Sequence, residues 1–180
     1  MSNTINWTLD QAHSEITFKV RHLMISNVKG GFETFNANVQ THGEDFSTAQ
    51  VELNIDASSI NTRNNDRDNH LKSADFFETE NYPSMKFVST KVEKVDEDTF
   101  KLHGNFTIKD VTKPIALDVD FGGVVTDPWG SQKAGFTVSG KINRKEWGLN
   151  WNAALEAGGV LVGDEIKLNA EMELYKPKAD

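Results

Sequence analysis

One stretch of the chain, residues 61–77, gathers the side chains that could do chemistry: NTRNNDRDNHLKSADFF. Arg67, Asp68 and His70 supply a fixed cation, a carboxylate and an imidazole, which are groups that acid–base catalysis and metal binding use. A hydrolytic or metal-dependent enzyme that uses this His/Asp/Arg cluster is therefore one hypothesis. The sequence contains neither G-x-S-x-G nor H-E-x-x-H, so no known catalytic motif accompanies the cluster.

The same stretch has part of the spacing of a calcium-binding loop. Counting from Asn64, acidic side chains follow at the third and fifth positions, and Asp75 takes the last position. However, Asn69 stands where the loop needs glycine for its sharp turn, and Asp75 stands where a bidentate Glu is usual. The alternative is a short helix capped by residue 64 or 65, with Asp66 and Asp68 in its first turn, where the helix dipole favours acids.

Three histidines suggest a second kind of site. His13 and His22 flank the first long predicted strand, and His70 lies in the 61–77 stretch. If the three met at one end of a barrel, they could hold zinc. None of them has the sequence spacing of a known metal motif, so we expect no metal and no other cofactor.

The elements that must position these groups have the pattern of strands. Seven segments alternate apolar and polar side chains with a period of two, and several are longer than a typical strand. Long amphipathic antiparallel strands bury one face and lose their edges by closing into a barrel, whereas a two-sheet sandwich usually has shorter strands. We predict an all-β, eight-stranded antiparallel barrel in one domain, residues 1–180. The seven segments are 15–20, 49–57, 84–92, 99–110, 114–123, 134–144 and 164–176.

Two aperiodic segments predict one or two short helical connections. One is the 61–77 stretch, and the other contains the helix-compatible NAALEA at 152–157. The predicted inward faces carry small residues, Ala57, Gly104, Gly140 and Ala170. Small residues inside an eight-stranded barrel either relieve crowding at a bend or leave room for an elongated ligand. A filled interior would instead indicate a structural or stress partner without a ligand.

Composition excludes several classes of protein. The net charge is −8, which argues against nucleic acid as the main partner. The chain has no cysteine, so disulfides and thiolate chemistry are absent. No apolar run is long enough to span a bilayer. The first residues lack the features of a signal peptide, so we expect a cytoplasmic protein, or a periplasmic one if a signal has been removed.

Three blocks of sequence resemble the YceI-like, polyisoprenoid-binding family from Trp7 to about Leu174. The first is WTLDQAHSEITFKVRHLMISNVKGGF, and the second is NNDRDNHLKSADFFETENYPSMKFVS. The third is GNFTIKDVTKPIALDVDF, followed by GFTVSGKINRKEWGLNW and VGDEIKL. Order, spacing and extent make the resemblance specific. Trp147 stands where phenylalanine is more usual, which is expected to alter the shape of a tunnel.

The resemblance implies a lipocalin-like barrel with an apolar tunnel, often a homodimer, that carries an isoprenoid lipid such as a polyprenyl pyrophosphate or an isoprenoid quinone. It makes the 61–77 stretch a cover over one barrel end, with a polar network of Arg67, Asp68 and His70. Leu71, Phe76 and Phe77 would then face the tunnel. It also places His22, Arg67 and His70 near the mouth. With strand phase, the expected tunnel lining is Phe18, Val20, Leu53, Phe76, Phe87, Leu102, Phe106, Leu117, Phe136 and Val138.

Overall fold

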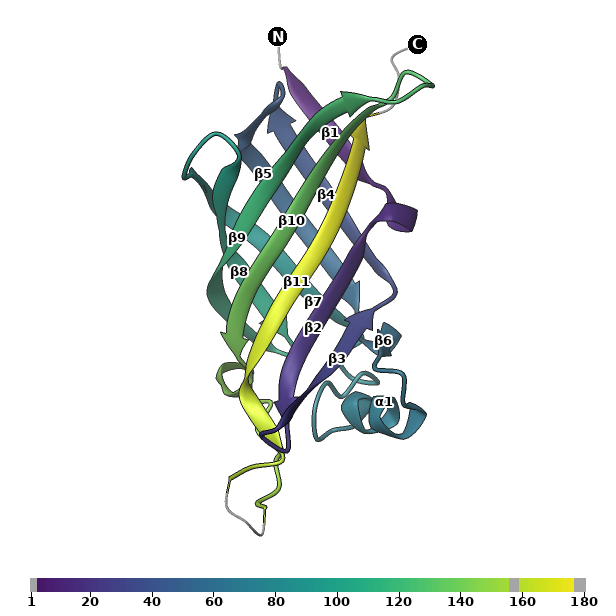
Figure 1. Cartoon of the computed structure of the whole chain (residues 1–180), viewed down its shortest axis with the longest axis vertical. Helices are drawn as coiled ribbons and strands as arrows, with labels where there is room; N and C mark the ends of the chain where they lie inside the picture. The colour runs from purple at the N-terminus through teal and green to yellow at the C-terminus, as the bar shows by residue number, and fades with distance from the viewer. Residues whose placement is uncertain (1–2, 156–158, 177–180) are drawn as a thin grey trace.

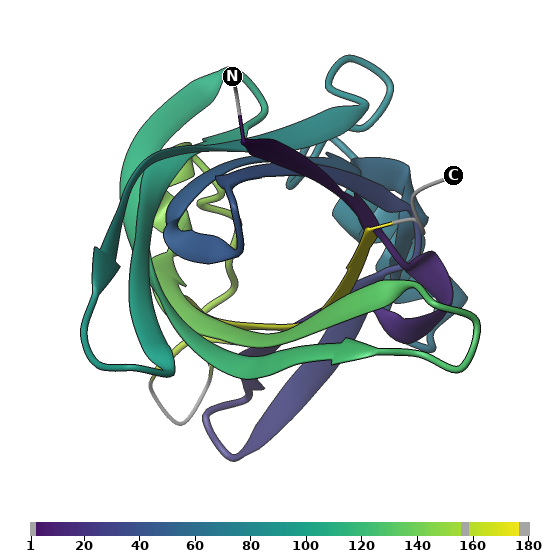
Figure 2. The ribbon, with the colours of Figure 1, turned by 90° about the horizontal axis from the view of Figure 1, so that it is seen from above.

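Eight strands close into an antiparallel barrel in the computed structural model, which describes residues 3–155 and 159–176 (Figure 1). Each strand pairs with the next, and β11 pairs back with β1, which closes the ring seen along the long axis in Figure 2. The predicted barrel is confirmed and the sandwich is wrong. The ring consists of β1 (Thr4–Leu9), β4 (Phe35–His42), β5 (Asp45–Asp56), β7 (Ser84–Lys94), β8 (Thr99–Ile108), β9 (Val111–Thr126), β10 (Gln132–Asn143) and β11 (Val162–Lys176).

Near the N-terminus, short interruptions divide β1 from β2 (Glu15–His22) and β3 (Ser26–Phe32) from β4. The 3-10 turn η1 (Gln11–His13) separates β1 from β2, and both strands pair with β11. The hairpin partner of β2 is β3, which leads into β4. The two-residue strand β6 (Ile60–Asn61) adds to the edge of β3. Among the described residues β3 pairs only with β2 and β6, so the sheet ends at β6 on this side of the barrel.

The 61–77 stretch forms the helix α1 (Asn65–Lys72), which lies beside β3 and β6 at the lower end of the barrel in Figure 1. The Asn64 side chain caps it by accepting from the Arg67 N–H at 3.0 Å, and Asp66 and Asp68 lie in its first turn. The helix alternative is therefore confirmed. The calcium loop is wrong because Asn64 caps the helix, and Asp68 turns back toward Thr62.

Two further 3-10 turns, η2 (Ala57–Ser59) and η3 (Arg144–Trp147), follow β5 and β10. The expected helix at 152–157 does not form in its described part, residues 152–155; residues 156 and 157 lie outside the described residues. Among the residues that the structure describes, no helix has the length and apolar character needed to cross a membrane.

Two of the small inward residues, Gly104 and Gly140, are covered by neighbouring side chains. A Cβ at Gly104 would meet the ring of Phe87, and one at Gly140 would meet the Leu117 side chain. Gly30 is covered in the same way by the ring of Phe18. These glycines therefore relieve crowding beside larger inward residues instead of leaving room. The prediction that Ala57 lies on an inward strand face is wrong, because Ala57 is buried in the 3-10 turn η2.

Candidate functional site

The barrel encloses a cavity of about 390 Å³, a volume within the range of small-molecule sites. All ten residues of the expected lining stand on its wall, together with Leu71 and Phe77. Seven of the ten are only half-buried although they point inward, because no side chain fills the space they face; these are Phe18, Val20, Leu53, Leu102, Leu117, Phe136 and Val138. The filled-interior alternative is therefore wrong. That these residues bind a ligand stays a prediction.

Aromatic rings pack together toward the barrel end opposite α1. Phe46 follows the β4–β5 turn and lies 4.9–5.2 Å, between ring centroids, from Trp7, Phe121 and Phe136. Phe46 is only 5% exposed. The Trp7 indole N–H donates to Thr41 Oγ1 at 2.9 Å, which gives this buried ring its polar partner. The packing narrows the cavity at this end. The α1 end, where Arg21, His22 and Arg67 line the cavity, is called the mouth below.

At the mouth, α1 is joined to the strand end by a polar network centred on Thr62. Asp68 accepts from the Thr62 N–H at 2.9 Å and from its hydroxyl at 2.5 Å. Arg67 donates through Nε to Thr62 Oγ1 at 2.8 Å and through Nη2 to the Thr62 carbonyl at 2.6 Å. The prediction of a network at Arg67 and Asp68 agrees with these contacts. His70 does not belong to it, because its Nε2 pairs instead with Asp75 Oδ2 at 2.8 Å.

Aromatic side chains pack under α1 and form the cavity wall there. The His70 ring makes edge contacts with Phe76 and Trp151, at centroid distances of 5.2 and 4.6 Å. Phe77 meets Phe32 edge-on at 5.9 Å. Because α1 has polar residues around most of its surface, its apolar contact with the barrel comes from Leu71 and from the Phe76–Phe77 pair that follows the helix.

The ionisable side chains on the cavity wall are all arginines and histidines. Arg21, His22, Arg67, His70 and Arg144 line it, and no Asp or Glu of the described residues does. In a chain of net charge −8, this is a local reversal of sign. A cavity of this kind favours a ligand with a long apolar part and an anionic or hydrogen-bond-accepting end.

Arg144, which the sequence interpretation missed, organises the loop beside the mouth. It is 2% exposed, and its guanidinium donates to the carbonyls of Leu149, Trp151 and Gly163 at 2.6–2.9 Å. Burial lowers its pKa, and the charge of Asp164 partly opposes that effect. Because its donors are occupied by backbone carbonyls, Arg144 acts as the support of the loop and not as a free anion-binding group.

Trp147 does not shape the tunnel as expected. It is 1% exposed, packs edge-on against Phe106 at 5.9 Å, and donates its indole N–H to the Phe106 carbonyl at 2.9 Å. It therefore lies behind the wall. The tryptophan on the wall is Trp151.

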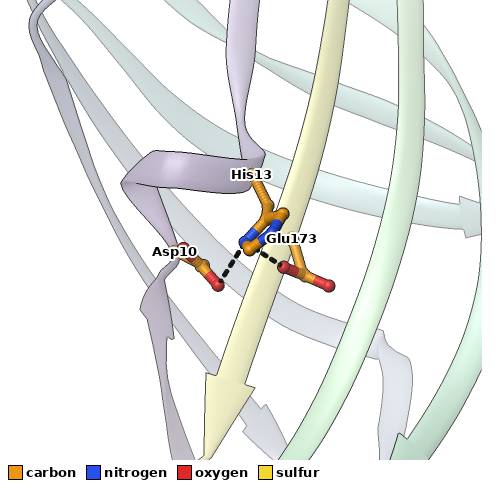
Figure 3. Close-up of side chains that lie close together, drawn as sticks. All are labelled: Asp10, His13 and Glu173. Atoms are coloured by element: carbon orange, nitrogen blue, oxygen red, sulfur yellow. Dashed lines mark hydrogen bonds and ion pairs between the residues drawn. The ribbon is translucent and has the colours of Figure 1, made fainter.

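The three histidines do not converge on one zinc site. His22 and His70 lie on the cavity wall, whereas His13 lies in η1 between Asp10 and Glu173 (Figure 3). The His13 Nδ1 is 3.0 Å from Asp10 Oδ2 and 3.2 Å from Glu173 Oε2. Among the described residues, Asp10, His13 and Glu173 form the one group of three possible metal ligands with donor atoms within 4.8 Å of one another.

Lys133 supplies this second cluster with a cation. Its Nζ lies 3.0 Å from Asp10 Oδ2. Burial alone would raise the pKa of Asp10, but hydrogen bonds with Lys133 and His13 outweigh burial and lower that pKa to about 2. The same contact with Asp10 raises the pKa of Lys133. The cluster therefore ties η1 to β10 and β11, and Lys133 balances part of the charge of its carboxylates.

Comparison with known proteins places the chain among similar sequences and folds. The family model described as "YceI-like domain" matches residues 7–174. A UPF0312 protein of Staphylococcus aureus (strain USA300) is 45% identical over 169 residues, which cover 93% of this chain and 96% of the relative. The structure of a Campylobacter jejuni YCEI protein is 37% identical with a TM-score of 0.76, covering 95% of this chain and 98% of that one.

Two more distant structures share the fold alone. BcnA of Burkholderia cenocepacia is 19% identical with a TM-score of 0.78, over 92% of this chain and 98% of its own. A polyisoprenoid-binding domain from Saccharophagus degradans is 14% identical with a TM-score of 0.70, over 96% of this chain and 99% of its own.

Proposed function

The chain belongs to the YceI-like domain family, and from this premise we propose that it is a non-catalytic carrier that holds a long-chain isoprenoid lipid in its barrel. One observation carries the proposal: inward apolar side chains of a closed barrel remain half-exposed to an unfilled cavity. A related fold named for polyisoprenoid binding supports it at the level of architecture.

Apolar burial would drive the binding. At about 25 cal/mol per Å² of apolar surface removed from water, a chain that buries several hundred Å² gains on the order of 10 kcal/mol. The cost of ordering a flexible chain reduces that gain substantially. The phenylalanines and leucines of the wall would therefore set affinity, and the mouth would choose the head group.

The basic mouth supports a polyprenyl pyrophosphate or an isoprenoid quinone as ligand. Arg67 uses Nε and Nη2 on Thr62, and its Nη1 has no hydrogen-bond partner among the described residues. Arg21 donates one Nη2 bond to the Met24 carbonyl. Spare guanidinium donors suit phosphate oxygens best and quinone carbonyls less well.

The rival function, an enzyme built on the His/Asp/Arg cluster, has weaker support. Asp68 is bonded to Thr62 and is 9% exposed, so it is not presented to a substrate as a free acid or base. Lipid analysis of the purified protein distinguishes the carrier from the enzyme. Native mass spectrometry and solvent extraction of protein purified from its own host should release an isoprenoid in near-stoichiometric amount. Stoichiometric zinc or calcium without lipid would favour the enzyme.

Pairing into a homodimer and a cytoplasmic location complete the proposal. Both derive from the sequence interpretation. Sedimentation velocity over a concentration series would test the first, and cell fractionation would test the second. A chain that stays monomeric at high concentration would remove pairing from the proposal without affecting the lipid.

A further inference from the structure

The hairpin between β2 and β3 exposes three consecutive large apolar residues at the mouth end of the barrel (Figure 1). Leu23, Met24 and Ile25 are 39%, 55% and 79% exposed. Val160, in the segment beside this hairpin, is 39% exposed. Exposed apolar groups gathered at one tip are unusual on a soluble domain and mark a surface that contacts something apolar.

The turn residues are poorly suited to the turn they make. Leu23 and Met24 both have positive φ, 53° and 62°, a conformation that asparagine and glycine adopt in two-residue hairpins at little cost. A leucine and a methionine in this conformation lower the stability of the folded protein, and no contact within the turn compensates for that cost. Their presence therefore indicates a role for the side chains, and strained residues of this kind concentrate at functional surfaces.

The tip is held against the cavity mouth. The Leu23 N–H donates to the Leu161 carbonyl at 2.9 Å, and Arg21 Nη2 donates to the Met24 carbonyl at 2.8 Å. Met24 also packs against Gly159. Arg21, His22 and Leu161, which border the tip, line the cavity. The apolar tip and the apolar interior are thus neighbours.

A row of lysines crosses the outer face of the barrel above the tip. Lys141 is directly opposite Lys167, Lys167 is opposite Lys19, and Lys19 is opposite Lys29 across four adjacent strands. Among the described residues, only Lys141 of this row has an ion-pair partner, Glu165 at 3.9 Å. Like charges placed directly opposite destabilise a sheet, so this row gains from an external anionic surface.

We propose that the mouth end of the barrel docks on a lipid bilayer, with residues 23–25 inserted among the head groups and the lysine row facing lipid phosphates. Lys19 and Lys29 each lie four residues from the tip, which is roughly 13 Å along a strand and about 10 Å along the axis of a tilted barrel. Apolar groups of interfacial proteins insert about 5–10 Å, so the ammonium groups reach the head-group layer. A lipid could then pass between bilayer and cavity without crossing water.

The opposite end of the barrel provides a matched control. Val125 and Trp129 are 66% and 80% exposed there, on or beside the β9–β10 turn. They are as apolar as the tip, but they lie at the end narrowed by the Phe46 cluster and do not line the cavity. Non-specific adsorption through exposed apolar residues would involve both ends of the barrel, whereas docking at the mouth involves only residues 23–25.

Site-specific dye labelling tests the orientation, because the chain contains no cysteine. Ile25→Cys and Val125→Cys variants would each carry an environment-sensitive dye and meet vesicles of phosphatidylcholine with or without phosphatidylglycerol. We expect a blue shift, and quenching by lipid-borne quenchers, at position 25 only. A response at both positions, at position 125 alone or at neither overturns the proposal. A blue shift at position 25 without vesicles that grows with protein concentration shows that a second copy covers the tip, and also overturns it.

Vesicle flotation measures the strength of docking. Loss of one buried large apolar side chain weakens partitioning by about tenfold or more, so M24S/I25S should weaken it roughly a hundredfold, while V125S/W129S leaves it unchanged. Charge reversal in K19E/K167E should weaken binding to anionic vesicles and scarcely affect neutral ones. Equal effects of the two apolar double variants would overturn the proposal. Circular dichroism would verify that every variant keeps the barrel.

This inference rests on the proposed carrier function, but the two can fail separately. Uptake of a detergent-dispersed isoprenoid at equilibrium reports the cavity, and the rate of transfer from vesicles reports the tip. M24S/I25S should keep the first and slow the second at least tenfold. Docking without uptake would remove the carrier function alone, and uptake with an unchanged transfer rate in the variant would remove the docking proposal alone.

Discussion

Asp68 accepts both hydrogen bonds that Thr62 can offer, from its backbone N–H at 2.9 Å and from its hydroxyl at 2.5 Å. Thr62 is 3% exposed and Asp68 is 9% exposed, so water does not replace this contact. Since Thr62 follows β6 and Asp68 lies in α1, the pair fixes where the helix sits over the mouth.

Replacing Asp68 should therefore loosen the mouth cover. Asp68→Ala leaves two buried donors of Thr62 unsatisfied, and we expect a loss of about 2–3 kcal/mol in the free energy of unfolding, measured by urea denaturation. The neighbouring Asp66→Ala, at an exposed position of the same helical turn, should cost less than about 1 kcal/mol. Equal losses for the two variants would show that helix charge, and not the Thr62 contact, stabilises this region.

Strand phase predicted the cavity wall well, because side chains alternate strictly in a pleated strand. Phe18, Leu102 and Val138 follow from alternation alone, and all line the cavity. The same rule could not decide whether Gly104 leaves room in the lumen or relieves crowding. Alternation gives its direction but not that the ring of Phe87 from the adjacent strand lies over it.

The strands β3 and β4 were not predicted, because their apolar alternation is weak in the sequence. None of the seven predicted segments covers β3 or β4, because Gly30 and Gly31 interrupt the apolar pattern of β3 and small or polar residues dilute that of β4. Thr41 is buried in β4, and its hydroxyl accepts from the indole of Trp7 on the next strand. Once β4 is known to be a strand, alternation with Phe35, Ala37 and Val39 places Thr41 on the buried face.

Side-chain clusters formed by residues far apart in the sequence could not be predicted from the sequence either. Asp10 and His13 meet Glu173 only because β11 pairs with both β1 and β2. The spacing of these residues in the sequence does not predict such a contact. Arg144 shows the same limit, since an arginine beside a predicted turn gives no sign that backbone carbonyls of a later loop will surround it.

The Asp10 cluster should make stability depend on pH at the acidic end. The pKa of Asp10 is about 2 in the folded protein, below its ordinary value of 3.8. A depressed carboxyl pKa contributes stability above about pH 4, and that contribution is lost as the pH falls toward 2. Asp10→Asn should therefore lower the urea midpoint at pH 6, at a cost of at most about 2 kcal/mol.

The difference between wild type and Asp10→Asn should shrink as the pH falls from 4 toward 2, as Asp10 itself becomes protonated. Asp118→Asn, on the exposed face of β9, serves as the control for general charge effects. A difference that stays constant over this range would mean that the contact with Lys133 does not stabilise the fold.

Covered glycines should differ sharply from open ones when a methyl group is added. A Cβ at Gly104 would overlap the Phe87 ring and the Val88 carbonyl oxygen. Gly104→Ala should therefore displace Phe87 and cost about 1–3 kcal/mol. Gly135→Ala, with no atom within 4 Å of the new Cβ, should be neutral or slightly stabilising. Thermal unfolding would compare them, and a neutral Gly104→Ala would show that the Phe87 ring moves freely in the cavity.

Filling the lumen should stop lipid uptake without unfolding the barrel. Ala170 lies on the cavity wall between Val138 of β10 and Ile16 of β2, and it is one of the small inward residues with open space before it. Because the cavity is unfilled, a phenylalanine at position 170 can occupy space that a ligand would otherwise use. We expect Ala170→Phe to keep the melting temperature within a few degrees of wild type and to reduce isoprenoid uptake at least tenfold.

Thr137→Phe places the same ring on the outer face of the neighbouring strand and should leave uptake unchanged. Uptake would be followed by native mass spectrometry after incubation with a detergent-dispersed polyprenyl lipid. A strongly destabilised Ala170→Phe would indicate that the wall cannot accept the ring, as in a packed core, where added methylenes cost about 1–3 kcal/mol. A stable Ala170→Phe that takes up as much lipid as wild type would place the ligand outside the barrel and contradict the carrier function.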